Sequence, residues 1–323
     1  MNRSAQSPAS IQLPKISICI PAYKADAFIA ETLASVKRQT FSDWELIVTE
    51  DGTKDRTEDL VSEFAKTVSQ PVVYNRHAVN RGLPDARNTG IGAARGQWVA
   101  FLDADDLWES KHLEALISQA ESADDDLVFA GAERFDHDSR KVLGQFVPSS
   151  KELGALPLSI YMGWLIILPS SILIRRETFD RFGLISTKFP HVNDTEYWLR
   201  VLRGGGKIGY SGNVTCLYRQ HARSMSRRTA ELLEENARLC AQYADWDAIP
   251  WNRKRSRPAD LYRWAANAAI NDDPAQALLL LKSSVRKDPL NVRSWLRFLR
   301  AAVRCTHLHR PHRPATQAKP YAR

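Results

Sequence analysis

The chain has 323 residues, of which 44% are hydrophobic and 25% charged, enough for one large domain or for a main domain with an appendage. Its four cysteines lie far apart, with neither a C-x-x-C pair nor zinc-ligand spacing, which argues against a disulfide framework and against a zinc site. The first residues lack the apolar segment of a secretory signal, so we expect a cytoplasmic protein.

Positive charge gathers toward the C-terminal end. Residues 221–323 hold 20 Lys and Arg against 9 Asp and Glu, a net charge of +11, whereas the whole chain carries +8. Residues 1–220 are therefore slightly acidic. A basic appendage favours an anionic surface as a partner but says little about chemistry.

Strands and helices alternate in the first third of the chain. Short runs rich in β-branched residues predict strands at residues 15–20, 45–49, 71–74 and 97–102. Apolar residues at helical spacing predict helices between these strands, the third of them at residues 83–95. The alternation predicts an α/β fold with a doubly wound, mainly parallel sheet, in which ligands bind beyond the carboxyl ends of the strands.

The best candidate for a membrane span is the apolar segment at residues 153–174. Prolines and glycines interrupt it, and it contains several serines. A span needs about 20 predominantly apolar residues. We therefore expect a buried strand and loop here.

Three aspartates, Asp103, Asp105 and Asp106, directly follow the predicted strand at residues 97–102. Carboxylates crowded at a strand end repel one another unless a cation lies among them, and oxygen ligands of this kind suit Mg²⁺ or Mn²⁺. Such ions usually hold phosphate oxygens as well. The cluster therefore predicts a metal-diphosphate site, with a solvated helix cap as the alternative.

The glycines at residues 90–95 superficially match a dinucleotide-binding pattern. The third glycine of that pattern is missing, and the segment lies in or at the end of a predicted helix, where the pattern needs a strand-to-helix turn. We therefore expect a tight helix exit and no NAD site.

Six segments in order resemble the family 2 inverting glycosyltransferases of bacterial surface-glycan type, which have a GT-A nucleotide-sugar fold. They are ISICIPAYK, FSDWELIVTEDGTKD, NRGLPDARNTGIGAARGQWVAFLDADDLW, SSILIRRETFDRFG, NDTEYWLR and LYRQHARSMS. The resemblance covers residues 15–228, which we expect to form the GT-A domain after a disordered segment at residues 1–14.

The resemblance implies a nucleotide site at the first strand ends. Pro21 and Tyr23 would flank the base, and Asp51 would accept a hydrogen bond from it, which suits uracil. Arg87 would face the diphosphate, with a structural ion pair as its alternative role. Lys24 stands where the family usually has asparagine, which leaves the donor open.

The same resemblance makes Asp103 and Asp105 the D-x-D element. Asp105 would bind the Mn²⁺ or Mg²⁺ ion directly, and Asp103 would share the ion or hold the ribose. Asp106 would have a capping or supporting role. His221 lies in an element found near the diphosphate, where it would contact the metal or a phosphate, or be structural.

On the acceptor side, the resemblance assigns the general base to Asp194. The family usually has a Glu-Asp pair here, and Asn193 replaces the first acid. Both residues also have a simple structural explanation, since Asn193 is a natural N-cap and an aspartate in a first helical turn is favoured by the helix dipole. The dipole would also keep Asp194 ionised, as a base requires.

Residues 229–306 are predicted to be helical and to resemble one and a half tetratricopeptide repeats, before a basic disordered tail at residues 307–323. We expect a basic linker at residues 252–258. In the last helix, the residues expected to face the core are Trp295, Phe298, Leu299 and Ala302. The opposite face carries Arg293, Arg297, Arg300 and Arg304, and is either a solvated face or a peripheral contact with the anionic inner face of the cytoplasmic membrane.

These features favour a metal-dependent, inverting and non-processive glycosyltransferase. It would move one sugar from a nucleotide-sugar, UDP-sugar first, to a hydroxyl of a glycan or lipid-linked glycan in envelope polysaccharide synthesis. The alternative is a non-catalytic nucleotide-sugar or glycan binder that uses its helical end as an interaction module. Nothing in the chain matches a nucleic-acid-binding module, so we expect no nucleic-acid partner.

Overall fold

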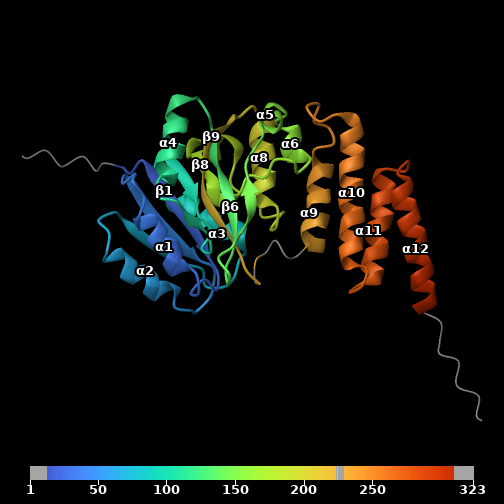
Figure 1. Ribbon diagram of the computed structural model, residues 1–323, viewed down its shortest axis with the longest axis horizontal. Helices are drawn as coiled ribbons and strands as arrows, with labels where there is room; N and C mark the ends of the chain where they lie inside the picture. The colour runs from blue at the N-terminus through green and yellow to red at the C-terminus, as the bar shows by residue number, and fades with distance from the viewer. Residues whose placement is uncertain (1–12, 223, 225–228, 309–323) are drawn as a thin grey trace, which may run out of the picture. The chain divides into compact units, whose positions relative to one another are not determined.

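The computed structural model describes residues 13–222, 224 and 229–308, and of residues 303–308 the backbone alone. Contacts divide the chain into two compact units, Met1–Arg227 and Arg228–Arg323 (Figure 1). The expected disordered ends, residues 1–14 and 307–323, lie almost wholly outside the described residues. Each unit is described by itself below.

The N-terminal unit alternates strands and helices in its first half, as the apolar pattern predicts. The strands are β1 (Ile16–Ala22), β2 (Trp44–Glu50), β3 (Val72–Arg76), β4 (Trp98–Phe101), β5 (Leu107–Trp108), β6 (Leu127–Asp136), β7 (Val142–Phe146), β8 (Ile172–Arg175) and β9 (Ile208–Gln220). The helices are α1 (Ile29–Lys37), α2 (Thr57–Ala65), α3 (Leu83–Ala93), α4 (His112–Ser122), α5 (Ser150–Gly154), α6 (Leu158–Tyr161), η1 (Pro169–Ser171), α7 (Glu177–Phe182) and α8 (Asn193–Arg203).

All nine strands form one sheet, in the order β3-β2-β1-β4-β8-β6-β9-β5, with β7 beside β6. The run β3-β2-β1-β4 is parallel, which is the part that the sequence predicts. Beyond it β8 runs antiparallel to both β4 and β6, so the sheet as a whole is mixed. The α/β class expected from the sequence is confirmed.

The apolar strands explain where the core lies. β1 and β2 are buried along their whole length, as strands covered on both faces are. Helix α3 packs against these two strands. A Cβ atom at Gly90 of α3 would lie 3.3 Å from the Cβ and Sγ atoms of Cys19 on β1. This glycine therefore allows a close approach of helix and strand.

The apolar segment at residues 153–174 is divided among short elements, namely the end of α5, then α6, η1 and most of β8. Among the described residues, no helix has both the length and the apolar content that a membrane crossing requires. The expectation of a buried strand and loop holds for β8, which is buried at Ile172, Leu173 and Ile174.

The C-terminal unit contains α9 (Thr229–Gln242), α10 (Trp251–Ala269), α11 (Pro274–Lys287) and α12 (Val292–Leu308). Small residues fill much of its core, so that the helices approach closely: Ala265, Ala266, Ala269, Ala277, Leu280, Leu281 and Ala301. The basic linker expected at residues 252–258 is wrong, because this stretch is the first half of the 19-residue helix α10, with Pro258 inside it. The resemblance to tetratricopeptide repeats stays a prediction.

The prediction of which α12 residues face the core is also wrong in part. Trp295 is 42% exposed and Leu299 56%, whereas Ser294 and Ala301 are buried. The packed face is therefore displaced by about one residue from the predicted one, because Ser294 finds a hydroxyl partner inside, Ser284, at 2.7 Å. The side chain of Arg304 lies outside the described residues.

Candidate functional site

The site lies where three parallel strands end side by side. Ala22 at the end of β1 is in register with Glu50 at the end of β2, and Cys19 of β1 is in register with Phe101 at the end of β4. Tyr23, Asp51 and Asp103 follow these strands directly or after one residue. Regular pairing of three strands therefore brings together residues that are far apart in sequence.

The three aspartates after β4 have different environments. Asp106 is buried, and its carboxylate accepts hydrogen bonds from the Ser170 hydroxyl at 2.6 Å and from the Arg219 backbone N–H at 2.9 Å. Burial raises the pKa of Asp106 well above its ordinary value, and the charges of Asp105 and Asp103 raise it further. Asp106 therefore ties the acidic loop to η1 and β9, which is the supporting role expected for it.

The other two carboxylates are partly open to solvent. The side chain of Asp103 is 27% exposed and that of Asp105 is 35% exposed. Asp105 Oδ2 lies 2.9 Å from Nε2 of His221, whose ring packs against Phe28 with centroids 4.5 Å apart. The structure thus brings His221 to the D-x-D element, although about 115 residues separate them in the chain.

Arg87 connects the two halves of the site. Its Nη2 donates to Asp103 Oδ1 and its Nη1 donates to Asn193 Oδ1, both at 2.7 Å. The side chain is only 3% exposed, and its Nε atom is buried without a hydrogen-bond partner among the described residues. Arg87 therefore makes the ion pair that the sequence left as its alternative role, and it also lies beside the site.

Asn193 does not cap α8, contrary to its simple interpretation. The N-cap position belongs to Val192, and the Asn193 amide donates to the Pro190 carbonyl at 2.9 Å while its oxygen accepts from Arg87. Asn193 is buried, so the amide is fully engaged between the loop and the arginine. Because the Asn193 side chain is neutral, Asp103 is the carboxylate that directly neutralises the charge of Arg87.

Asp194 begins the first turn of α8 beside this pair. Its Oδ1 accepts a hydrogen bond from the Thr195 backbone N–H at 2.6 Å, and in the described part of the chain Oδ2 has no partner. Burial raises the pKa of Asp194 above its ordinary value of 3.8, while the charge of Arg87 and the Thr195 hydrogen bond act in the opposite direction. The sequence expectation considered the helix dipole alone and missed this effect of burial.

The residues expected to contact the nucleotide base differ in how exposed they are. Pro21 is buried in β1, whereas the Tyr23 ring is half exposed with the Lys24 ammonium 5.2 Å from its centroid. Asp51 already accepts hydrogen bonds from the His77 ring at 2.7 Å and from the backbone N–H groups of residues 81 and 82 at 2.9 and 2.7 Å. A carboxylate has about four acceptor positions, so one remains for a ligand.

Arg219, two residues before His221 at the end of β9, lies behind the D-x-D loop. Its side chain is fully buried, and its guanidinium donates to the Asp105 carbonyl at 2.6 Å and to Glu31 at 3.1 Å. A third contact at 3.0 Å reaches Nδ1 of His137. Arg219 therefore fixes the backbone of the D-x-D loop from behind.

Sequence reasoning missed Ser170 and His77. Ser170 accepts from the Asp103 N–H at 3.0 Å and donates to Asp106, and His77 joins Asp51 to the Thr89 hydroxyl at 2.8 Å. Both residues are buried. The small polar pair at residues 170–171, placed just before an apolar strand, was the one available signal for Ser170.

The residues present fit a divalent ion that is shared with a phosphate ligand. In the described ranges, no group of three or more His, Cys, Asp and Glu residues is placed to hold an ion by itself. Asp105 and Asp103 offer oxygen ligands at a partly open edge. Mg²⁺ is commonly held by one or two carboxylates together with substrate phosphates, and Asp105 and Asp103 would supply the carboxylates of such a set.

Comparison with known proteins agrees with this arrangement. The model of the glycosyl transferase family 2 matches residues 17–183, slightly more than half of the chain. The chain belongs to glycosyl transferase family 2. The matched region contains the ends of β1, β2 and β4 and the whole D-x-D loop. It ends before Asp194 and His221.

Two bacterial proteins are similar in sequence to this family 2 chain. The glycosyltransferase EpsJ of Bacillus subtilis is 30% identical over 66% of this chain and 63% of its own length. Escherichia coli WfgD, named a UDP-Glc:alpha-D-GlcNAc-diphosphoundecaprenol beta-1,3-glucosyltransferase, is 31% identical over 58% of this chain and 70% of its own. The chain thus spans somewhat less than two-thirds of EpsJ.

Solved structures show the same fold as this family 2 chain. Staphylococcus aureus TarS 1-349 in complex with UDP-GlcNAc aligns with a TM-score of 0.63 at 16% identity, covering 93% of both chains. The mannosyltransferase PcManGT of Pyrobaculum calidifontis, in complex with GDP-Man and Mn²⁺, aligns with a TM-score of 0.59 at 18% identity, covering 96% of this chain and 92% of its own. The expected GT-A type of fold is confirmed.

Proposed function

We propose that this chain is a metal-dependent, inverting glycosyltransferase that moves a single sugar from a UDP-sugar to a hydroxyl of a glycan or lipid-linked glycan. The observation that carries the proposal is the bridge from Asp103 through Arg87 and Asn193 to the start of α8, where Asp194 lies. Donor and acceptor groups are thereby held on two sides of one buried arginine. The names of WfgD and of the TarS complex support UDP-sugar and a lipid-linked acceptor.

On the donor side, Asp105 and Asp103 supply metal ligands, with His221 as a third contact to metal or phosphate. A divalent ion bound there, with Mn²⁺ supported by the PcManGT complex, would neutralise charge that develops on the departing nucleoside diphosphate. Pro21, Tyr23 and the remaining acceptor position of Asp51 would hold the base. Arg87, which pairs with Asp103, lies beside these ligands and would stabilise negative charge that builds up on the diphosphate.

On the acceptor side, Asp194 removes the proton of the attacking hydroxyl at its Oδ2 atom. The new bond forms between that hydroxyl oxygen and the anomeric carbon as the bond from this carbon to the diphosphate breaks. Attack from the opposite face inverts the anomeric configuration, and the proton remains on Asp194. The raised pKa of Asp194 makes it a stronger base than an exposed aspartate.

Donor binding is tested with a thermal-shift panel of nucleotide-sugars in the presence of Mn²⁺ or Mg²⁺, followed by product analysis with the best donor. We expect stabilisation by UDP and a UDP-sugar, dependence on the ion, and hydrolysis or transfer of the sugar. Asp105→Asn should lower this activity at least about a hundredfold. The matched control is Asp138→Asn, because Asp138 is exposed and lies outside the site.

Two results would contradict the proposal. A chain that binds UDP-sugar but neither hydrolyses nor transfers it, with any acceptor pool, would be a binding protein. Absence of stabilisation by every nucleoside diphosphate tested would remove the donor assignment itself.

A further inference from the structure

Helix α12 presents three different stripes along its length. The inner stripe is formed by Ser294, Phe298 and Ala301, of which Ser294 and Ala301 are buried and Phe298 packs against the helical core. Their spacing of four and three residues is that of one helix face. The packed face therefore uses small residues and one aromatic ring.

A second stripe is apolar and exposed. Val292, Trp295, Leu296 and Leu299 follow i, i+3, i+4 and i+7, which places them on one face, and they are 67%, 42%, 51% and 56% exposed. Leu290, just before the helix, is 80% exposed. Large apolar side chains gathered on one exposed face indicate a binding surface more often than isolated ones do.

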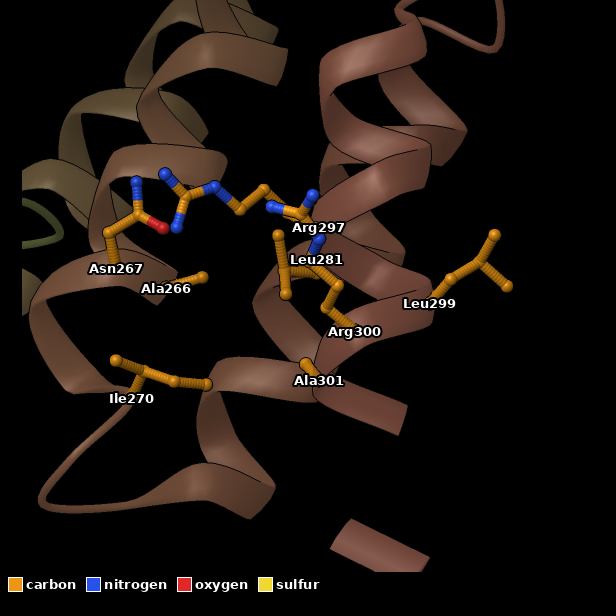
Figure 2. Close-up of a pocket in the computed structure, with 8 residues that line it drawn as sticks. All are labelled: Ala266, Asn267, Ile270, Leu281, Arg297, Leu299, Arg300 and Ala301. Carbon is orange, nitrogen blue, oxygen red and sulfur yellow. The ribbon is translucent and has the colours of Figure 1, made fainter. Parts of the chain in front are cut away.

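The third stripe is basic and lies beside the apolar one. Arg293, Arg297 and Arg300 follow i, i+4 and i+7, and none of the three has an ion pair or hydrogen bond with another described residue. Arg297 and Arg300 also line a cavity of about 530 Å³ between α10, α11 and α12, together with Asn267. Figure 2 shows the Arg297 side chain extending from α12 toward Asn267, while the Arg300 side chain extends along α12 toward Arg297.

We propose that α12 is a membrane-binding element that docks on an anionic phospholipid bilayer. The apolar stripe enters the interface, and Arg293, Arg297 and Arg300 bind lipid phosphates, with the cavity between Arg297 and Asn267 open to a headgroup. Charge complementarity selects this partner, because residues 221–323 carry a net charge of +11 and the three arginines have no ion-pair partner among the residues that the structure describes. A helix with Trp and Leu on one side and Arg beside them is the pattern of interfacial helices.

This surface is independent of the sugar-transfer assignment, since it uses none of the residues at the D-x-D element. It would bring the chain to the surface that holds a lipid-linked acceptor. Binding is therefore measured without nucleotide, by flotation of the full-length chain with phosphatidylcholine vesicles that contain or lack phosphatidylglycerol. We expect binding to the anionic vesicles alone, weakened by added salt.

Two double variants separate the parts of the surface. Arg297→Gln with Arg300→Gln should weaken binding to anionic vesicles about thirtyfold. Leu296→Ser with Leu299→Ser should weaken it at least about tenfold. The matched control is Arg286→Gln with Lys287→Gln, which removes the same charge from exposed residues at the end of α11 and should change binding less than about threefold. Thermal melting and the UDP-induced thermal shift should stay unchanged in all three, so that a fold defect or a failed donor assignment is recognised separately.

Three outcomes would overturn the proposal. Equal losses for the control pair and the arginine pair would mean general charge attraction. Competition by inorganic phosphate, but not by chloride at the same ionic strength, would make the arginine pair a site for free phosphate. A dimer in sedimentation that the leucine variants dissociate, with vesicle binding unchanged, would make the apolar stripe an interface between two copies.

Discussion

Arg87 and Asn193 are hydrogen-bonded at 2.7 Å although 106 residues separate them in the chain. This bond joins α3 to the first turn of α8, which are the proposed donor and acceptor sides. Since Arg87 also donates a hydrogen bond to Asp103, one buried guanidinium contacts both halves of the site.

Arg87→Lys keeps the charge but removes the planar fork that reaches two partners at once. We expect a loss of about 2–3 kcal/mol in the free energy of unfolding, somewhat below the cost of breaking a fully buried pair, because Asp103 is partly exposed. The Michaelis constant for the donor should rise about tenfold or more. Urea unfolding and steady-state kinetics measure both effects.

The control for this variant is Arg81→Lys. Arg81 is 54% exposed and pairs with Asp85 at the surface, so its replacement should cost less than about 1 kcal/mol. Equal effects of the two variants would show that the bridge has no special role.

Asn193→Asp should move the acidic limb of the pH–rate profile upward. The base must be ionised, so the rate falls as the pH drops through the pKa of Asp194. The charge of Arg87 now lowers that pKa, and a carboxylate at position 193 would neutralise Arg87 and repel Asp194. We expect the acidic limb of the pH profile of kcat/KM to move up by roughly one pH unit.

Asn193→Ala is the uncharged comparison for this experiment. It removes the hydrogen bond to Arg87 without adding a charge, so the rate should fall while the limb moves little. A limb that moves to lower pH in Asn193→Asp would contradict the electrostatic link.

His112 should make the fold less stable in mild acid. Burial lowers the pKa of His112 from 6.5 to about 3, and the ring stacks on Trp108 with centroids 4.5 Å apart. The folded state therefore keeps the neutral form, and its contribution to stability is present above pH 6.5 and is lost as the pH falls from 6.5 toward 3. Between pH 7.5 and 5 the loss should approach about 2 kcal/mol.

Urea unfolding at the two pH values, in the wild type and in His112→Gln, measures this term. The glutamine variant is expected to be less stable at pH 7.5 but to lose less stability on acidification. An unchanged pH dependence in the variant would exclude His112 as its source.

Gly92 and Gly96 form a matched pair of glycine substitutions. A Cβ atom at Gly96 would lie 2.6 Å from the Ser17 backbone nitrogen, so Gly96→Ala should cost about 1–3 kcal/mol. A Cβ at Gly92, near the end of α3, meets nothing within 4 Å, and Gly92→Ala should stabilise the chain by roughly 0.5 kcal/mol. Thermal melting of both variants measures the two changes in stability, which should have opposite signs.

The sequence by itself determined the parallel half of the sheet and the position of the acidic loop. Apolar runs such as the one in β4 leave few choices of element, and a strand that ends in aspartates places them at the sheet edge. It also predicted that the helix at residues 83–95 ends near its glycines, as α3 does at Ala93. These conclusions depend on local periodicity and on short-range sterics, both of which can be seen in a linear chain.

Tertiary structure alone decided which partners the polar residues chose. The Arg87–Asn193 bond, the burial of Arg219 behind Asp105, and the rise in the pKa of Asp194 all depend on contacts between distant segments. The exposed stripe of α12 was decided in the same way, since Trp295 and Phe298 look equivalent in a pattern and only Phe298 packs, partly buried, against the helical core. Side-chain burial is set by the neighbours that the fold supplies, and a linear pattern does not contain them.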